Sequence, residues 1–282
     1  MNQIPSPQDY KTVLNRHYQQ KNLTHAIFSA LEKAGTDTAA LTIGSLGPME
    51  ELHIAGRKAT MRLGRSAGLR PGMTVLDIGC GIGGPARTLA HFFGCRVIGI
   101  DLAEAFCIAA GAITQKMKLT HLVNILHADA LALPVKNSAL DIVWAQHVTM
   151  NIPDKPGLFT EINRVLKPGG KLVLYEILSG CSHDLYLPLP FATDSALCFL
   201  QSEADLSASV QAAGFRPLVW ENITASARET QQKVINAIHQ KGLPVLNPGI
   251  LLGPDFVLMA QNLLKNLETG RIQILEAILT CQ

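Results

Sequence analysis

The strongest structural signal in the sequence is MTVLDIGCGIGGPARTLAHFFGCRVIGI, residues 73–100. It opens on a short apolar run, TVLDI, whose β-branched and aliphatic residues suit a strand buried on both faces. Glycines follow where the strand must turn sharply into a helix, so that backbone rather than side chain can face a ligand. These glycines are Gly79, Gly81, Gly83 and Gly84. A helix over 85–93 and a buried strand over 96–101 complete one strand–turn–helix–strand unit, which ends in Asp101.

Two nucleotide-type ligands fit such a unit, and Asp77 helps to separate them. A dinucleotide places its pyrophosphate at the helix N-terminus, where a neighbouring carboxylate would repel it. S-adenosylmethionine carries no phosphate, and its ammonium and sulfonium groups are cations that suit a carboxylate. The glycine spacing, D-I-G-C-G-I-G-G, also departs from G-x-G-x-x-G. Asp101 does not discriminate, because it could accept hydrogen bonds from the ribose of either ligand.

The length and composition set broad limits on the protein. A chain of 282 residues with 48% hydrophobic and 16% charged residues fits one large α/β domain with a cap, a large core and an apolar cleft. A formal charge of +2 provides no basic stripe for nucleic acid, and no block of charge suggests a membrane patch. We therefore expect neither nucleic acid nor membrane as a partner.

The cysteines and the termini indicate the compartment. No C-x-x-C pair or regular disulfide spacing relates the six cysteines, so we expect buried free thiols in a reducing environment. The first residues, MNQIPSPQDY, lack the apolar centre of a signal peptide, and no apolar run approaches the roughly 18 residues of a membrane span. A soluble, cytoplasmic protein is expected. Metal-ligand spacings such as H-x-x-x-H are absent too, so no metal site is predicted.

The segment before the glycine unit is expected to be helical. Apolar periodicity over 9–34 and a helix over about 56–67 predict an N-terminal helical cap or lid, residues 1–70. Tyr18 is a candidate lid residue over the ligand, although simple packing explains it equally well. His53 is either a structural histidine or one that reaches the cleft of the glycine unit.

The next strands bring polar residues to the ligand edge of the sheet. A strand over about 122–127 ends near Asp129 and Ala130. Ligands of doubly wound sheets lie beyond the carboxyl ends of the strands, so Asp129 would suit an adenine amino group, unless it only caps a turn. A fourth strand over 139–152 contains Trp144, expected in the core, and carries further polar residues to the same edge. These are Gln146, His147, Met150 and Asn151.

The rest of the chain completes the predicted fold. The other predicted elements are helices over 103–115, 156–166 and 203–213 and strands over 171–178, 216–224 and 271–281. An irregular segment over 179–193 holds Tyr186 and Phe191, which could line a substrate pocket. Two helices within 226–268 form an insertion that would extend the cap. The prediction is a single α/β domain, 1–282, with a doubly wound, mostly parallel, seven-stranded Rossmann-like core over 71–225 and 269–282.

Several of these motifs together resemble class I S-adenosylmethionine-dependent methyltransferases. The resemblance is carried by VLDIGCGIGGPARTLA, GIDLA, HADALALP, ALDIVWAQHVTMNIPDK and RVLKPGGKLVLYE. Within that superfamily the chain is similar to the methyltransferase type 11 group that includes sarcosine/dimethylglycine N-methyltransferases; EELHIAGRKAT and NLLKNLETGRIQ extend the similarity over most of the chain. Two departures stand out, ELHIAG in place of an aromatic-rich D-x-F-H-G-G and PLPFA in place of P-x-P-W-A. Fewer aromatic faces are thus available to a cationic amine.

The resemblance implies S-adenosylmethionine as the cofactor, S-adenosylhomocysteine as its product and a set of site residues. The implied cofactor-binding residues are Tyr18, Asp77, Gly79, Cys80, Gly81, Gly83, Asp101, Leu102, Asp129, Ala130 and Gln146. The candidate catalytic residues are His147 and His53, and those expected to contact the acceptor are His53, Met150, Asn151, Tyr186 and Phe191.

The function expected from these features is methyl transfer to nitrogen or oxygen of a small molecule by a monomer or homodimer. A neutral amine presents its own lone pair, whereas a hydroxyl benefits from a base such as His147 or His53. Two other classes remain open, a nicotinamide-dependent oxidoreductase and a non-catalytic protein that binds S-adenosylmethionine.

Overall fold

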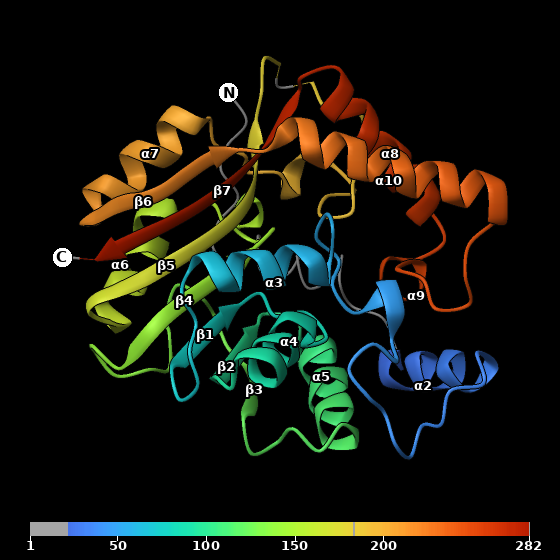
Figure 1. Cartoon of the computed structure of the whole chain (residues 1–282). Coiled ribbons are helices and arrows are strands. Elements are labelled where there is room, and N and C mark those ends of the chain that lie inside the picture. Colours follow the sequence, from blue (N-terminus) through green and yellow to red (C-terminus); the bar gives the residue numbers. More distant parts are fainter. Residues whose placement is uncertain (1–21, 183, 282) are drawn as a thin grey trace.

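The computed structural model describes residues 22–182 and 184–281, which form a single sheet with helices on both faces (Figure 1). Its strands are β1 (Thr74–Ile78), β2 (Arg96–Asp101), β3 (Val123–His127), β4 (Leu140–Gln146), β5 (Leu166–Ser179), β6 (Phe215–Asn222) and β7 (Ile272–Cys281). They are ordered β3-β2-β1-β4-β5-β7-β6, with β1 to β5 parallel and β7 antiparallel to both of its neighbours. The predicted doubly wound, mostly parallel, seven-stranded sheet is confirmed.

The helices also follow the predicted periodicity closely. They are α2 (Leu23–Lys33), α3 (Arg57–Ser66), α4 (Gly84–Phe93), α5 (Glu104–Lys116), α6 (Lys155–Val165), α7 (Glu203–Ala212), α8 (Thr224–Lys241), α9 (Gly249–Leu252) and α10 (Phe256–Glu268). Alternate residues of β4 enter different cores, as a strand buried on both faces requires. Trp144 packs in the cluster that also contains Leu63 of α3 and Leu89 of α4, whereas Val143 packs with Phe159 of α6.

The segments predicted to form a cap meet one another beside the sheet. Ile27 of α2 lies in one apolar cluster with Phe106 of α5 and Leu251 of α9. Figure 1 shows α2 beside α5 and below α9, while α8 and α10 cross the upper part of the molecule. Tyr18 lies outside the described residues. How residues 1–70 and 226–268 act as a cap stays a prediction.

The fourth strand is shorter than predicted, and the difference shapes the site. We expected a strand over 139–152, but β4 ends at Gln146, His147 takes a positive φ of 53°, and Thr149–Asn151 form a 3-10 turn. The cause lies on the neighbouring strand, where the buried Glu176 carboxylate accepts hydrogen bonds from Thr149 N at 3.2 Å and Thr149 Oγ1 at 2.9 Å. The chain after Gln146 therefore folds over the carboxyl end of the sheet.

The cysteines are all free, but they are not all buried. Cys80, Cys95, Cys107 and Cys281 are buried, Cys198 is half-buried and Cys181 is exposed. The prediction of burial is wrong for Cys181, which lies just beyond the end of β5. Within 22–182 and 184–281, no helix is both long and apolar enough to cross a membrane, and no cluster of His, Cys, Asp or Glu could hold a metal ion.

Candidate cofactor and acceptor site

One cavity follows the carboxyl ends of the first four strands and extends beneath α10. Its glycine-turn lobe comes from the ends of β1, β2 and β3 and includes Gly79, Cys80, Gly81, Asp101, Leu102, Ala128, Asp129 and Ala130. Its far lobe comes from the segment before α3, the chain after β4, β5, the 179–193 segment and α10. The far lobe comprises His53, Gln146, His147, Met150, Asn151, Ile177, Pro190, Phe191 and Leu263.

The glycine turn brings bare backbone to the cavity because its glycines take conformations that other residues avoid. Gly79, Gly81 and Gly83 have φ values of 66°, 55° and 82°. A Cβ at Gly79 would lie 2.5 Å from Val148 Cγ2, so no side chain fits there. Gly83 does not line the cavity; it precedes α4 as its N-cap residue.

Asp77 lies just before this turn as a buried carboxylate with an unfilled partner site. It is 2% exposed, and its Oδ2 atom has no hydrogen-bond partner. Burial, reinforced by the nearby charges of Glu51 and Asp101, raises the pKa of Asp77 well above its ordinary value. Asp77 does not line the cavity itself, but a cation at the turn would stabilise its ionised form. The ammonium of S-adenosylmethionine has that chemistry.

The carboxylates at the end of β2 and after β3 are fixed by backbone N–H groups. Asp101 accepts hydrogen bonds from Gly81 N and Ala103 N, each at 2.9 Å, while burial raises its pKa. Asp129 accepts one from Leu131 N at 2.9 Å, so it caps a turn and also lines the cavity. Both carboxylates lie at the edge of the sheet where the ribose and the adenine amine of the cofactor would need acceptors.

A buried polar network that the sequence analysis missed holds the segment before α3. The Glu51 carboxylate is bonded to His53 Nε2 at 3.1 Å, Thr60 Oγ1 at 2.6 Å and Thr88 Oγ1 at 2.7 Å. Burial alone would raise the pKa of Glu51, but the hydrogen bond and charge of His53 and the two hydroxyls hold that pKa below its ordinary value. His53 Nδ1 lies 3.3 Å from the carbonyl of Ile54. Both ring nitrogens of His53 are therefore already engaged by other atoms of the protein.

Gln146 lines the cavity and has a side-chain donor without a partner. Its Oε1 accepts hydrogen bonds from Trp144 Nε1 at 2.8 Å and Thr60 Oγ1 at 3.0 Å. The indole can only donate, so it fixes which end of the amide is the oxygen. The Nε2 atom is then left buried and without a partner.

His147 presents a second buried atom without a partner, Nε2. Its backbone N donates to Tyr175 O at 2.7 Å, and its ring lies 4.8 Å from the Tyr175 ring and 6.0 Å from the His53 ring. Burial and the neighbouring His53 lower the pKa of His147 well below its ordinary value. The imidazole is therefore neutral at ordinary pH.

Most of the residues that we expected in the site line the cavity, and a few do not. Tyr186 is not brought to the cavity; its ring packs under Lys265 Nζ at 3.8 Å and Arg271 at 4.4 Å. Asn151 lines the far lobe, where its Nδ2 donates to the carbonyls of Phe191 and Leu197. Leu263, from α10, reaches the cavity from the other end of the chain and was not anticipated. Only the apolar periodicity of α10 hinted at it, and periodicity cannot say what a buried residue faces.

Comparison with known proteins finds a family model and several relatives that match part of the chain. Residues 76–174 match the family model described as "Methyltransferase domain". The chain is 34% identical over 172 residues to sterol 24-C-methyltransferase ERG6B of Gibberella zeae, covering 58% of this chain and 45% of that protein. It is 30% identical over 149 residues to the glycine/sarcosine/dimethylglycine N-methyltransferase of Actinopolyspora halophila, covering 53% of this chain and 24% of that protein. The chain thus matches less than half the length of either relative.

A solved structure extends the likeness to the whole fold. Geranyl diphosphate C-methyltransferase from Streptomyces coelicolor A3(2), in complex with Mg²⁺, geranyl diphosphate and S-adenosyl-L-homocysteine, superposes with a TM-score of 0.71 at 18% identity. The alignment covers 99% of this chain and 100% of that one. The chain therefore has the class I methyltransferase fold.

Proposed function

We propose that this chain, which has the class I methyltransferase fold and carries the methyltransferase domain over residues 76–174, transfers a methyl group from S-adenosylmethionine to a small-molecule acceptor. The observation that carries the proposal is the buried Oδ2 of Asp77, which has no partner and lies before a bare glycine turn. Asp101 is the last residue of β2, and Asp129 follows β3. A ligand with an ammonium, a ribose and an adenine amine satisfies all three carboxylates, and S-adenosylmethionine has these groups.

The far lobe supports methyl transfer through positioning. Bound S-adenosylmethionine supplies a methyl group on a sulfonium, and an acceptor held in line with it needs no nucleophilic side chain. Holding two reactants in near-attack geometry contributes roughly 7–11 kcal/mol to lowering a barrier. Met150, Phe191 and Leu263 would exclude water from the acceptor, while Gln146 and His147 would flank the methyl group.

The two other functional classes fit the site less well. A nicotinamide dinucleotide would bring its pyrophosphate to the turn beside Asp77, and an anion offers this buried carboxyl group no counter-charge. A protein that only binds S-adenosylmethionine would have no need of a second lobe that continues beyond the glycine turn.

The cellular setting belongs to the same proposal. Six free cysteines support a reducing, cytoplasmic location.

The relatives are named for methylation of a sterol carbon and of glycine-derived amines, so their names leave the acceptor of this chain open.

The test is transfer of label from methyl-tritiated S-adenosylmethionine into pools of small amines, phenols, alcohols and lipids. The proposal expects a labelled product from at least one pool, and a much slower reaction for the Asp77→Asn variant. Binding of S-adenosylhomocysteine without transfer to any pool would instead favour the non-catalytic protein.

A further inference from the structure

Among the described residues, the far lobe has no charged group that is free to pair with a charged acceptor. Among the described residues that line the cavity there is no lysine or arginine. The two glutamates that line the cavity already have partners: Glu50 is bonded to Arg57 and Arg87, and Glu51 lies 3.7 Å from Arg57 Nε and is hydrogen-bonded to His53. The rest of the lobe is largely apolar. A carboxylate, phosphate or ammonium would therefore be buried there without a counter-charge, which is strongly unfavourable.

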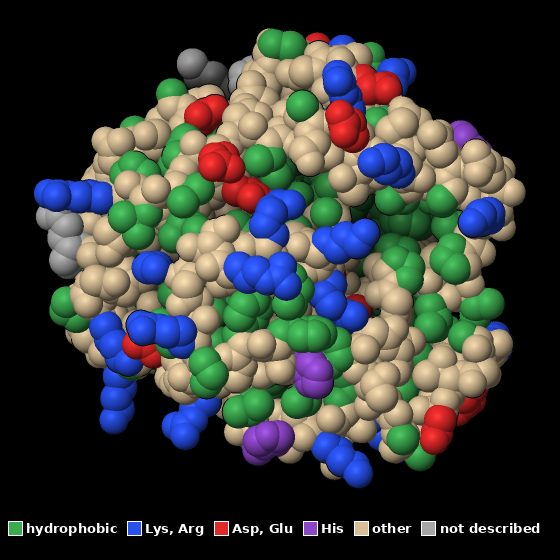
Figure 2. Space-filling view, viewed as in Figure 1, with side chains coloured by type: hydrophobic (Ala, Val, Ile, Leu, Met, Phe, Trp, Pro, Cys, Tyr) green, Lys and Arg blue, Asp and Glu red, His purple; other side chains and the backbone are tan. Residues whose placement is uncertain are grey.

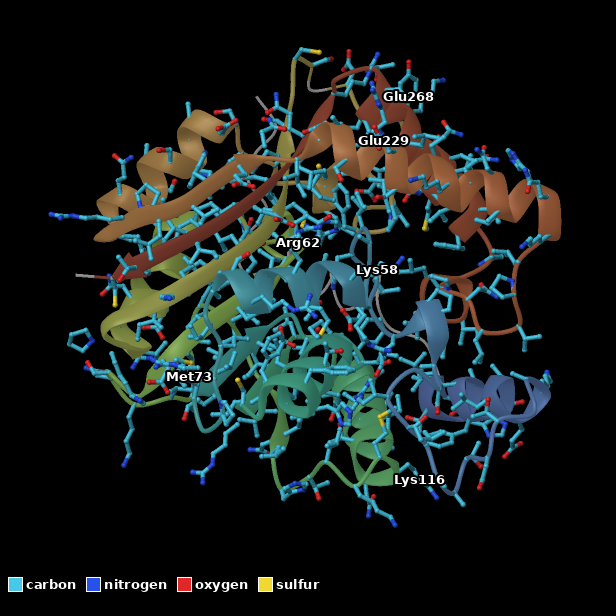
Figure 3. The ribbon with its side chains drawn as sticks, viewed as in Figure 1. Lys58, Arg62, Met73, Lys116, Glu229 and Glu268 are labelled. Carbon is cyan, nitrogen blue, oxygen red and sulfur yellow. The ribbon has the colours of Figure 1, made fainter. Side chains whose placement is uncertain are left out.

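Two further cations of α3, Lys58 and Arg62, lie outside the cavity. Figure 2 shows lysine and arginine side chains gathered over α3, and Figure 3 places Lys58 and Arg62 on that helix. Both are exposed, and Arg62 is paired with Glu276 of β7. They do not line the cavity, so they do not offset the charge of a bound acceptor.

Gln146 and His147 are adjacent in the chain and both line the cavity, and each has one buried side-chain atom without a partner. The two atoms differ in chemistry. Gln146 Nε2 can only donate, because Trp144 holds the amide oxygen on the opposite side. His147 Nε2 belongs to a neutral ring and can accept a proton when the other nitrogen carries the hydrogen. A hydroxyl group satisfies both atoms, since its oxygen accepts and its hydrogen donates. A primary ammonium has no lone pair for Gln146.

We propose that the acceptor is an uncharged, largely apolar phenol or alcohol, whose hydroxyl oxygen accepts a hydrogen bond from Gln146 Nε2 and whose hydroxyl hydrogen is directed at His147 Nε2. This assignment rests on the proposed methyltransferase function. It makes Gln146 a specificity-determining residue and His147 the proton acceptor of an O-methylation.

The proposed step balances without any further reactant. A lone pair of the hydroxyl oxygen forms the O–C bond to the methyl carbon, and the C–S bond breaks with its electron pair on sulfur. The hydroxyl proton passes to His147 Nε2 and then to solvent. As the O–C bond forms, the hydroxyl proton becomes strongly acidic, so even a weakly basic imidazole takes it in the transition state.

Binding to the protein saturated with S-adenosylhomocysteine tests the substrate class. The probes are phenol, 2-naphthol and 1-decanol. Each is matched with a carboxylate and an alkylammonium compound that carry the same hydrocarbon group. We expect at least one hydroxyl compound to bind at least 10-fold more tightly than both of its charged counterparts. Tighter binding by a charged counterpart, or no binding by any hydroxyl compound, would overturn the assignment. Failure of S-adenosylhomocysteine itself to bind would instead overturn the proposed function.

Variants of Gln146 test the donor. Gln146→Met removes it, while Gln146→Glu keeps one oxygen for Trp144 and Thr60 and replaces the donor with a second oxygen. Each should weaken binding of the preferred hydroxyl compound roughly 3- to 10-fold and leave the affinity for S-adenosylhomocysteine unchanged. The matched control is Gln201→Met, since Gln201 also has a buried amide atom without a partner but lies outside the cavity. Loss of S-adenosylhomocysteine affinity in the Gln146 variants would assign this donor to the cofactor and contradict the proposal.

His147→Asn tests the proton acceptor, because asparagine tolerates the left-handed backbone at this position. With the preferred hydroxyl compound, kcat for formation of the methyl ether should fall by about 100-fold or more, while KM changes little. A variant that binds S-adenosylhomocysteine normally and keeps its kcat would exclude His147 as the proton acceptor.

Discussion

The indole Nε1 of Trp144 donates a 2.8 Å hydrogen bond to Oε1 of Gln146, two residues further along β4. Alternate residues of a strand share a face, so the core residue and the cavity residue lie side by side. Trp144 is fully buried, and its donor sets the direction of the amide. A core residue thus determines which atom the cavity offers to a ligand.

Replacing this donor should affect the acceptor and spare the cofactor. Trp144→Phe keeps an aromatic ring in the core but lets the Gln146 amide rotate. We expect KM for the acceptor to rise roughly 3- to 10-fold and stability to fall by about 1–3 kcal/mol through the lost bond and the smaller ring. Steady-state kinetics and calorimetric titration with S-adenosylhomocysteine measure the two effects. An unchanged acceptor KM would show that the amide keeps its direction without the indole.

Asp77 should release a proton when the cofactor binds. Its pKa in the folded protein is raised above the ordinary value of 3.8. Above pH 3.8 the unfolded chain ionises first, so the protein without cofactor loses stability as the pH rises. Between 3.8 and the raised pKa the folded protein keeps the proton, and an arriving ammonium favours its loss. Calorimetry of S-adenosylhomocysteine binding in two buffers of different ionisation enthalpy should reveal this release.

The control for that measurement is Asp77→Asn. It should abolish the proton release and weaken S-adenosylhomocysteine binding by about 10-fold or more, in keeping with loss of a charge-assisted contact. Binding heats that do not depend on the buffer in the unmodified protein would contradict a protonated Asp77 in the free site.

The Glu51–His53 pair should make the protein sensitive to acid. The pKa of Glu51 is held below its ordinary value of 4.5, so its stabilising contribution is complete above pH 4.5 and is lost as pH falls through the lowered value. Glu51→Gln should cost roughly 3–5 kcal/mol near neutral pH, because His53 loses its buried partner. The difference in melting temperature between variant and parent should shrink as pH falls below 4.5. A constant difference in melting temperature across that range would show that the Glu51–His53 pair does not cause the acid sensitivity.

The glycine turn offers a matched pair of alanine substitutions. Gly79→Ala should cost roughly 2–4 kcal/mol, because the new Cβ meets Val148 and the backbone has positive φ. Gly111→Ala, inside α5 with nothing within 4 Å of the new Cβ, should instead stabilise by about 0.5–1 kcal/mol. Chemical denaturation measures both. Equal effects of the two substitutions would contradict the geometry of the turn.

The sequence predicts the sheet well because buried parallel strands leave continuous apolar runs between turn signals. The glycines, Asp101 and Asp129 follow those runs directly, so their common edge could be inferred without coordinates. The end of β4 could not be inferred in this way. Val148 and Thr149 favour a strand, and the 3-10 turn depends on Glu176, which lies 27 residues beyond Thr149 in the sequence.

The far lobe was predicted less completely, because it too depends on contacts between residues that are distant in the sequence. His147, directly after β4, and Phe191, in the irregular 179–193 segment, were recognised as candidates. The bonds from Glu51 to Thr88 and from Thr60 to Gln146, by contrast, join residues 37 and 86 positions apart. No periodicity records such pairings. Tyr186 was expected in the cavity because it is an aromatic residue in a loop. Its ring packs against Lys265 and Arg271 instead.

The most direct measurement is a calorimetric titration of the protein with S-adenosylhomocysteine and, separately, with NAD. A site in which buried Asp77 receives an ammonium predicts saturable binding of S-adenosylhomocysteine, strongly weakened in Asp77→Asn, and no saturable binding of NAD. Tighter binding of NAD than of S-adenosylhomocysteine, or S-adenosylhomocysteine binding that is indifferent to Asp77→Asn, would contradict it.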